Sequence, residues 1–202
     1  MSSGTDELLQ CRTGLTQVRI KPVALLTGSV ELRMFRQSTA PRPGRCAVNR
    51  VFVDMDGVIV DFDQLKSDLG VDVEALKGMQ GAFRRMRPMP GAIEGVRSLI
   101  AMGFEVWIAS KPVTGVPHCY SEKVEWILNH LPELKRRIIL THDKGLLGDA
   151  GDVLIDDRPH KANCQQFPGT LIVFGGACTW DDVVRTLARR RRTHTAADAL
   201  VG

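Results

Sequence analysis

From Arg50 onward, short apolar and β-branched runs recur along the chain, with longer amphipathic stretches among them. The runs are Val51–Val53, Val106–Ile108, Arg137–Leu140, Val153–Ile155 and Leu171–Phe174. Runs that are apolar on both faces are typical of buried parallel strands. The pattern therefore predicts five strands of one parallel sheet.

Stretches of helical length accompany these runs. Residues 91–102 place Ile93, Val96, Leu99 and Ile100 on one face, residues 121–131 place Val124, Ile127, Leu128 and Leu131 on one face, and a last helix is expected at Asp181–Arg190. Strands that alternate with helices predict an α/β fold, a Rossmann-like doubly wound parallel sheet.

Residues 61–90 interrupt the alternation. This segment is rich in Gly and Pro and contains one short helical piece, Val73–Met79. Because it directly follows the first strand, we expect it to form a small cap above the carboxyl edge of the sheet.

The positive charge of the chain is concentrated at its two ends. The net charge is +4, but residues 1–50 carry +5, residues 183–202 carry +4, and residues 51–182 carry −5. A stretch rich in Pro, Gly and Arg before residue 46 is typical of a linker. We expect a poorly ordered basic extension at 1–46, a folded domain at 47–192 and a tail at 193–202. An acidic body makes nucleic-acid binding unlikely and suggests a site for a cation.

Composition excludes several other classes of protein. No apolar run has the length that a membrane helix needs. The acidic start does not resemble a secretory signal, and five scattered cysteines without a CxxC pair are typical of a reducing compartment. We therefore expect a cytoplasmic protein that does not bind membranes; a homodimer is compatible with the sequence.

Polar side chains follow four of the expected strands, at the point where each strand ends. They are Asp54 and Asp56 after the first, Ser110 after the second, Lys144 after the third, and Asp156 with Asp157 at the fourth. Ligands of an open parallel sheet bind at the carboxyl edge of its strands. We therefore expect these side chains to converge.

The chemistry of this set suits a phosphate bound beside a metal ion. Clustered carboxylates repel one another unless a cation lies between them, and Mg²⁺ prefers oxygen ligands. The metal and the lysine would neutralise phosphate oxygens, the hydroxyl would donate to one, and a carboxylate would remain to attack phosphorus. Taken singly, each of these residues also has an ordinary explanation as a turn or a helix cap.

As a set, these motifs resemble the haloacid dehalogenase-like (HAD-like) phosphatase superfamily. More narrowly, the sequence resembles the 5′(3′)-deoxyribonucleotidase family, with further similarity around Pro90, at His118–Trp126 and at Arg137–Lys144. The resemblance covers about residues 50–190 and implies hydrolysis of nucleoside monophosphates.

The resemblance also implies roles for the acidic residues. Asp54 would form a phosphoaspartyl intermediate, and Asp56 would protonate the leaving hydroxyl and then activate water. Mg²⁺ would be held by the side chain of Asp54, the backbone carbonyl of Asp56 and the late acidic pair. Within that pair, we favour Asp157 over Asp156 as the direct ligand.

Ser110 and Lys144 would bind the phosphate, and Lys111 is a further candidate phosphate-binding residue. Two features depart from the family pattern. Lys111 follows Ser110 where the family has a serine, which places an extra positive charge beside the phosphate site. The cap is shorter than in the family, and its candidate pocket residues are Phe62 and Phe83, the aromatic side chains available to stack on a base.

We therefore predict a Mg²⁺-dependent phosphatase that acts on a nucleoside monophosphate, preferably a deoxyribonucleotide. Three alternatives stay open at this point. They are the same chemistry on another small phosphate ester, a receiver domain that accepts a phosphoryl group, and a non-catalytic protein that binds phosphate or metal. The presence of Asp56 two residues after Asp54 argues against the receiver domain, because Asp56 supplies the base that empties the intermediate.

Overall fold

The computed structural model describes residues 50–198 of the chain. The extension that we predicted at 1–46 lies outside the described residues, as does the end of the predicted tail. In the part of the chain that is described, no helix combines the length and the apolar character needed to cross a membrane.

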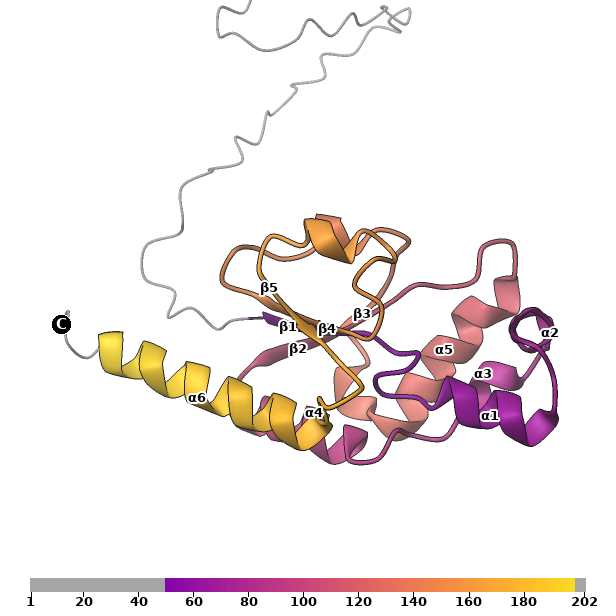
Figure 1. Ribbon diagram of the computed structural model, residues 1–202, viewed down its shortest axis with the longest axis horizontal. Helices are drawn as coiled ribbons and strands as arrows, with labels where there is room; N and C mark the ends of the chain where they lie inside the picture. The colour runs from indigo at the N-terminus through magenta and orange to yellow at the C-terminus, as the bar shows by residue number, and fades with distance from the viewer. Residues whose placement is uncertain (1–49, 199–202) are drawn as a thin grey trace, which may run out of the picture. The chain divides into compact units, whose positions relative to one another are not determined.

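A five-stranded sheet forms the centre of this domain (Figure 1). Its strands are β1 (Arg50–Val53), β2 (Glu105–Ser110), β3 (Ile138–Leu140), β4 (Val153–Asp156) and β5 (Thr170–Val173). They lie in the order β3-β2-β1-β4-β5, and all neighbours are parallel. The predicted parallel α/β fold is confirmed. The strand order reverses between the central strand, β1, and its neighbour β4.

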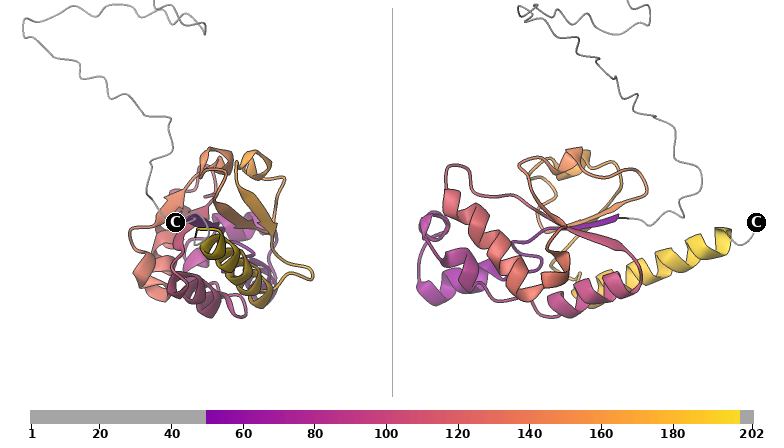
Figure 2. Two further views of the ribbon diagram at one scale, coloured as in Figure 1. Left: turned by 90° about the vertical axis from the view of Figure 1, so that its left-hand side faces the viewer. Right: turned by 180° about the vertical axis from the view of Figure 1, so that it is seen from behind.

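Three long helices lie on one side of the sheet, as Figures 1 and 2 show. They are α4 (Ala92–Ala101), α5 (Pro117–His130) and α6 (Trp180–Asp198). The loops on the other side contain the short 3₁₀ helices η2 (Lys144–Leu146) and η3 (Cys164–Gln166); a third, η1 (Pro132–Leu134), follows α5. The last helix begins one residue before the predicted start and extends eight residues beyond the predicted end at Arg190.

The two faces of the sheet bury separate apolar clusters. Val51 and Val53 point to the helical side, whereas Phe52 points to the loops and packs edge-on against Phe167, as the two-residue period of a strand requires. On the helical side, α4 and α6 approach closely at Gly95, where an added Cβ would lie 2.4 Å from the Trp180 ring.

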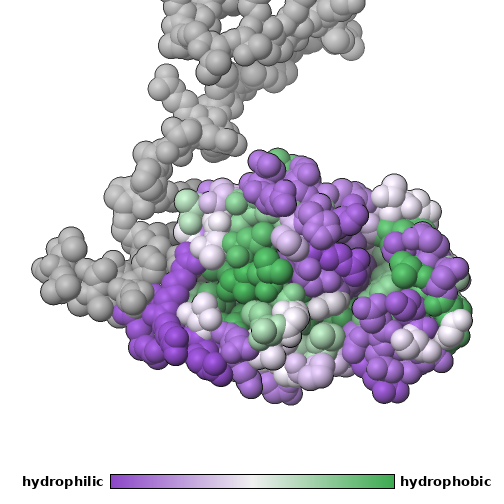
Figure 3. All heavy atoms as spheres, viewed as in Figure 1, coloured by the Kyte–Doolittle hydropathy of each residue, from purple (hydrophilic) through white to green (hydrophobic). Residues whose placement is uncertain are grey.

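The edge strand β5 is less well covered. Its Val173 is half exposed, and an apolar area appears among hydrophilic side chains in Figure 3.

Three helices, rather than the one we predicted, form the segment between β1 and α4. They are α1 (Phe62–Leu69), α2 (Val73–Gly78) and α3 (Ala82–Arg85). Asp61 and Asp72 cap the first two helices by accepting backbone N–H groups. Of these helices, α3 packs on α5 (Figure 1). We call residues 61–90 the cap.

The buried face of α5 differs from the one we predicted. Leu128 is 41% exposed, although we expected it in the core, whereas Glu122 and Lys123 are buried. Ile127 and Leu131 are buried as we predicted, so apolar spacing found part of the buried face and missed its charged positions. Two charged residues point inward instead, because each has buried polar partners in the cap or at the sheet edge.

Candidate active site

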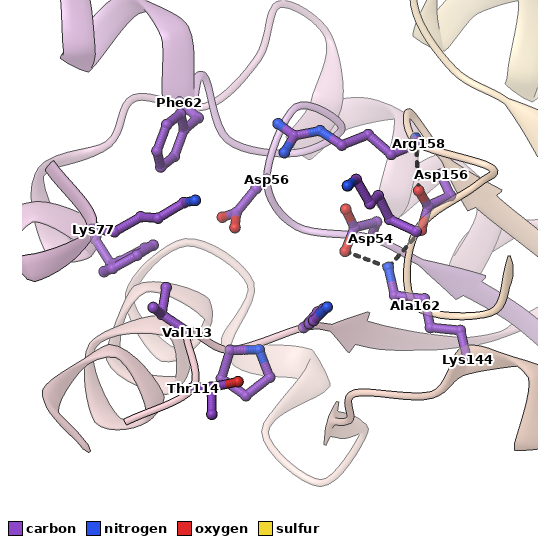
Figure 4. A pocket seen from close by; sticks show the side chains of 14 residues that line it. Asp54, Asp56, Phe62, Lys77, Val113, Thr114, Lys144, Asp156, Arg158 and Ala162 are labelled. Atoms are coloured by element: carbon purple, nitrogen blue, oxygen red, sulfur yellow. Dashed lines mark hydrogen bonds and ion pairs between the residues drawn. The ribbon is translucent and has the colours of Figure 1, made fainter. Parts of the chain in front are cut away.

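A cavity of about 330 Å³ lies at the carboxyl edge of the sheet, beneath the cap. It is lined by Asp54, Asp56, Phe62, Lys77, Phe83, Lys111, Pro112, Val113, Thr114, Lys144, Asp156, Arg158, Lys161 and Ala162. Figure 4 shows Asp54 and Asp56 side by side, with the cap residues Phe62 and Lys77 on one side and Lys144 on the other. The cavity falls within the size range of small-molecule sites.

The first pair of carboxylates is positioned by a tight turn after β1. The backbone N–H of Asp54 still donates to the Ile155 carbonyl of β4 at 2.9 Å, so Asp54 continues the strand. The chain then folds back, and the Met55 carbonyl accepts N–H groups from the residues at 58, 59 and 60. Gly57 has a φ of +79°, and a Cβ there would lie 2.5 Å from a carboxylate oxygen of Asp157. Glycine is therefore required by both backbone conformation and space.

Lys144 connects carboxylates from two strands. Its ammonium donates to Asp54 at 2.6 Å and to Asp156 at 2.5 Å, and its side chain is 3% exposed. It follows β3, the edge strand, but its backbone N–H donates to the Ala162 carbonyl in the loop after β4 at 2.7 Å. That bond joins the start of η2 to the loop after β4.

Burial raises the pKa of Asp54 from its ordinary value to about 6. Lys144 acts in the opposite direction, and the neighbouring carboxylates Asp156 and Asp56 raise the pKa further. The carboxylate is thus costly to ionise until a further positive charge approaches it.

Three carboxylates lie close enough to share one cation. Oxygens of Asp54, Asp156 and Asp157 all lie within 4.8 Å of one another. Oδ1 of Asp157 is buried and has no hydrogen-bond partner among the described residues, and burial raises the pKa of this carboxyl group. A hard divalent cation that prefers oxygen ligands fits this set.

The two late carboxylates differ in how their oxygens are used. Oδ1 of Asp156 accepts the Arg158 backbone N–H at 2.8 Å, and its Oδ2 accepts Lys144 and the Cys164 thiol. Asp157 keeps Oδ1 without a partner, while its Oδ2 pairs with the Arg158 guanidinium at 3.1 Å. This difference favours Asp157 as a direct ligand and Asp156 as the residue that holds Lys144.

Lys123 is a site residue that we did not predict from the sequence. Its ammonium lies 2.7 Å from both carboxylate oxygens of Asp56 and 3.0 Å from Ser110 Oγ. The side chain is almost completely buried, and the ammonium lies 4.9 Å from the centre of the Phe83 ring. Lys123 therefore fixes Asp56 and joins the ends of β1 and β2.

Ser110 lies at this junction, not on the cavity wall. It is 1% exposed, and its hydroxyl accepts from Lys123. The next residue, Lys111, does line the cavity. A direct contact between Ser110 and phosphate stays a prediction.

Both aromatic residues that we proposed for the pocket line the cavity. Phe62 comes from α1 and is 7% exposed; Phe83 comes from α3 and is fully buried against Lys123. Glu122 of α5 holds α3 in place by accepting the backbone N–H groups of Gly81 at 2.6 Å and Phe83 at 3.2 Å. The cap is thus connected to the same helix that supplies Lys123.

Three further basic residues, which we did not predict from the sequence, line the cavity: Lys77, Arg158 and Lys161. Arg158 and Lys161 follow the acidic pair at the end of β4, so their position after a motif strand was the available signal. Lys77 lies on α2 next to an ordinary helical partner, Glu74, at 2.9 Å. Its sequence environment resembles that of any surface lysine.

The fold and the site together define a phosphatase of the HAD-like superfamily. A family model described as "5' nucleotidase, deoxy (Pyrimidine), cytosolic type C protein" matches residues 76–189, more than half of the chain. The chain belongs to the 5′(3′)-deoxyribonucleotidase family, which confirms the resemblance read from the motifs. It is accordingly a phosphoric monoester hydrolase.

Individual relatives agree with this membership. A putative 5′(3′)-deoxyribonucleotidase of Bordetella bronchiseptica is 34% identical over 139 residues, which cover 54% of this chain and 74% of the relative. The human cytosolic type of 5′(3′)-deoxyribonucleotidase is 30% identical over 176 residues, or 70% of this chain and 87% of the relative. The human mitochondrial 5′(3′)-deoxyribonucleotidase is 27% identical over 183 residues, or 74% and 79%.

Proposed function

We propose that this protein is a Mg²⁺-dependent phosphatase that hydrolyses nucleoside monophosphates through a phosphoaspartyl intermediate. The observation that carries the proposal is the convergence of Asp54, Asp56 and Lys144 on one cavity at the sheet edge, with Asp157 beside it. Family membership supports the nucleotide substrate, since the relatives are named as deoxyribonucleotidases.

Asp54 is the nucleophile in this proposal. One of its oxygens accepts Lys144, and Figure 4 shows the side chain at the cavity. A carboxylate oxygen of Asp54 attacks phosphorus while the bond between phosphorus and the ester oxygen breaks. Lys144 lowers the repulsion between this carboxylate and an anionic phosphate, because its ammonium lies between Asp54 and Asp156.

Asp56 is the general acid and base. It donates a proton to the leaving ester oxygen, and it then accepts a proton from the water that attacks the phosphoaspartate. Phosphate leaves, and Asp54 is restored. Lys123 acts as a positioning residue, since it holds both oxygens of Asp56 toward the cavity from behind.

The residues that would hold Mg²⁺ are Asp54 and Asp157, with the backbone carbonyl of Asp56; Asp156 contributes through Lys144. A divalent cation bound there would polarise the phosphoryl group and offset its charge. The partnerless oxygen of Asp157 supports this assignment.

The cap would bind the nucleoside. Phe62 is the better candidate to stack on a base, because the ring of Phe83 is fully buried and contacts Lys123. A preference for deoxyribonucleotides is part of the proposal. The cytoplasmic location also stays a prediction, because the named relatives include both a cytosolic and a mitochondrial type.

The test is hydrolysis of p-nitrophenyl phosphate and of a panel of nucleoside 5′- and 3′-monophosphates and sugar phosphates, with Mg²⁺ and with EDTA. We expect turnover with Mg²⁺ and a preference for the nucleotides. Asp54→Asn should abolish turnover, whereas Asp181→Asn, an exposed aspartate of α6, should leave it unchanged. Turnover by the Asp54 variant would refute the covalent mechanism, and a preference for sugar phosphates would favour another small ester as substrate.

A further inference from the structure

The basic residues that line the cavity fall into two groups. Lys144, Arg158 and Lys77 each pair with a carboxylate, at 2.5 to 3.1 Å. Lys111 and Lys161 also line the cavity, but neither ammonium lies within 4.0 Å of a carboxylate oxygen in the described part of the chain. These two lysines are therefore available to a ligand.

Lys111 and Lys161 reach the cavity from different loops. Lys111 follows the last residue of β2, and Lys161 lies in the loop between β4 and η3. The backbone of Lys161 is fixed, because its N–H donates to the Arg158 carbonyl and its carbonyl accepts the Cys164 N–H. The two lysines thus line one cavity from two separate loops, and hydrogen bonds hold the backbone of the Lys161 loop.

The charges at the reaction centre nearly balance without these two lysines. Four carboxylates, those of Asp54, Asp56, Asp156 and Asp157, face three cations, Lys123, Lys144 and Arg158, which leaves one negative charge. A divalent cation and a phosphate monoester dianion add equal and opposite charges. Lys111 and Lys161 together therefore more than offset the remaining negative charge and leave a positive surplus in the cavity.

We propose that Lys111 and Lys161 form a second anion subsite, which binds a phosphate group of the substrate other than the one that is hydrolysed. The inference rests on the proposed function and names its substrate class: small molecules with two separate phosphate groups, such as a nucleoside 3′,5′-bisphosphate. Asp54 takes the phosphoryl group from one ester, water then releases it from Asp54 as phosphate, and the second phosphate remains on the alcohol product. Two ammonium groups match the charge of this second dianion.

The experiment compares kcat/KM for matched pairs of substrates with Mg²⁺. One pair is thymidine 3′,5′-bisphosphate and thymidine 5′-monophosphate; the other is fructose 1,6-bisphosphate and fructose 6-phosphate. We expect the bisphosphate to be preferred at least about tenfold in one pair, and the pair in which this occurs identifies the carrier as a nucleoside or a sugar. The preference should shrink as salt is raised, because exposed charges are screened.

Variants separate the second subsite from the scissile phosphate. Lys111→Met and Lys161→Met should each lower the ratio of bisphosphate to monophosphate kcat/KM, and the double variant should bring it close to one. Lys135→Met, which removes an exposed lysine outside the cavity, should leave the ratio unchanged. An equal loss on both members of a pair would show that these lysines bind the scissile phosphate, and it would overturn the inference.

The two proposals fail in different ways. Hydrolysis of nucleoside monophosphates without any preference for bisphosphates would overturn the second subsite and leave the proposed function intact. An absence of hydrolysis with every substrate, p-nitrophenyl phosphate included, would overturn both.

Discussion

Glu122 offers a sharp test of how the cap is held over the active site. Its two carboxylate oxygens accept the backbone N–H groups of Gly81 and Phe83. Gly81 directly precedes α3, and Phe83 lies within α3 and lines the cavity. Glu122→Ala removes both acceptors and leaves two N–H groups in a region with little access to water. The Glu122 side chain is fully buried, so water does not readily replace its carboxylate as the acceptor of these two hydrogen bonds.

The expected cost follows from the two bonds. A hydrogen bond to a charged group contributes about 1.5 to 3 kcal/mol, and the longer bond to Phe83, at 3.2 Å, contributes the smaller part. Removal of the buried carboxylate returns some desolvation energy. We therefore expect Glu122→Ala to lower the free energy of unfolding, or the free energy of opening the cap, by about 3 kcal/mol.

Glu125 provides a matched control on the same helix. Its carboxylate pairs with Arg84 of α3 at 2.6 Å, but both side chains are more than 40% exposed. Such surface pairs contribute at most about 1 kcal/mol. Glu125→Ala should therefore have little effect, although it also removes a contact between α5 and α3.

Urea unfolding measures the free energy of unfolding, and amide hydrogen exchange measures the free energy of opening the cap. We expect faster exchange in α3, above all at Gly81 and Phe83, together with a higher KM for nucleoside monophosphates. Glu122→Gln keeps carboxamide oxygen as one acceptor and should give an intermediate result if the alanine variant fails to fold. Equal effects of Glu122→Ala and Glu125→Ala would refute the assignment of Glu122 as the anchor of the cap.

Two other variants test the charged residues of the site. Lys123→Met keeps the aliphatic packing but removes the ammonium that holds Asp56. We therefore expect kcat to fall about 100-fold with little change in KM. A change confined to KM would contradict a positioning role. Because burial raises the pKa of Asp54 to about 6, the native state binds this proton more tightly than the unfolded state does, and the free energy of unfolding should fall as pH rises from about 4 to about 6. In EDTA, Asp54→Asn should therefore gain thermal stability relative to the unsubstituted protein as pH rises through this window. Mg²⁺ at pH 7 should stabilise the unsubstituted protein more than the variant. Equal pH profiles of the two proteins would refute the cause given for the pKa shift.

The sheet and its functional edge were predictable because their signals are local. Runs such as Val51–Val53 and Val153–Ile155 are apolar at every position, which marks strands covered on both faces. Once the strands are parallel, the residues that follow them must share one edge, so Asp54 and Asp156 could be brought together across about a hundred residues without coordinates.

The cap was less predictable because its helices offer few apolar positions. Residues 62–69 bury one side chain, Phe62, and only Leu65 and Leu69 among the others pack against the core. Polar residues occupy the rest, so the helix of eight residues shows a weak periodicity. Capping by Asp61 was the clearest signal, but an aspartate before a polar stretch also fits a turn.

The residues that the sequence concealed are charged side chains that point inward. Lys123 lies one residue after Glu122 on α5, and periodic patterns assign such positions to solvent because they detect burial only through apolar residues. Its partner Asp56 is 67 positions away, and the partner of Lys144 at Asp54 is 90 positions away. A buried ammonium is stable only when a carboxylate meets it, so each inward lysine depends on a contact that no local pattern contains. Lys144 was found because it follows a strand, whereas Lys123 reaches Asp56 from the middle of a helix, behind the cavity. Position at a strand end, and not charge alone, was therefore the information that identified Asp54, Lys144 and Asp156 in this chain.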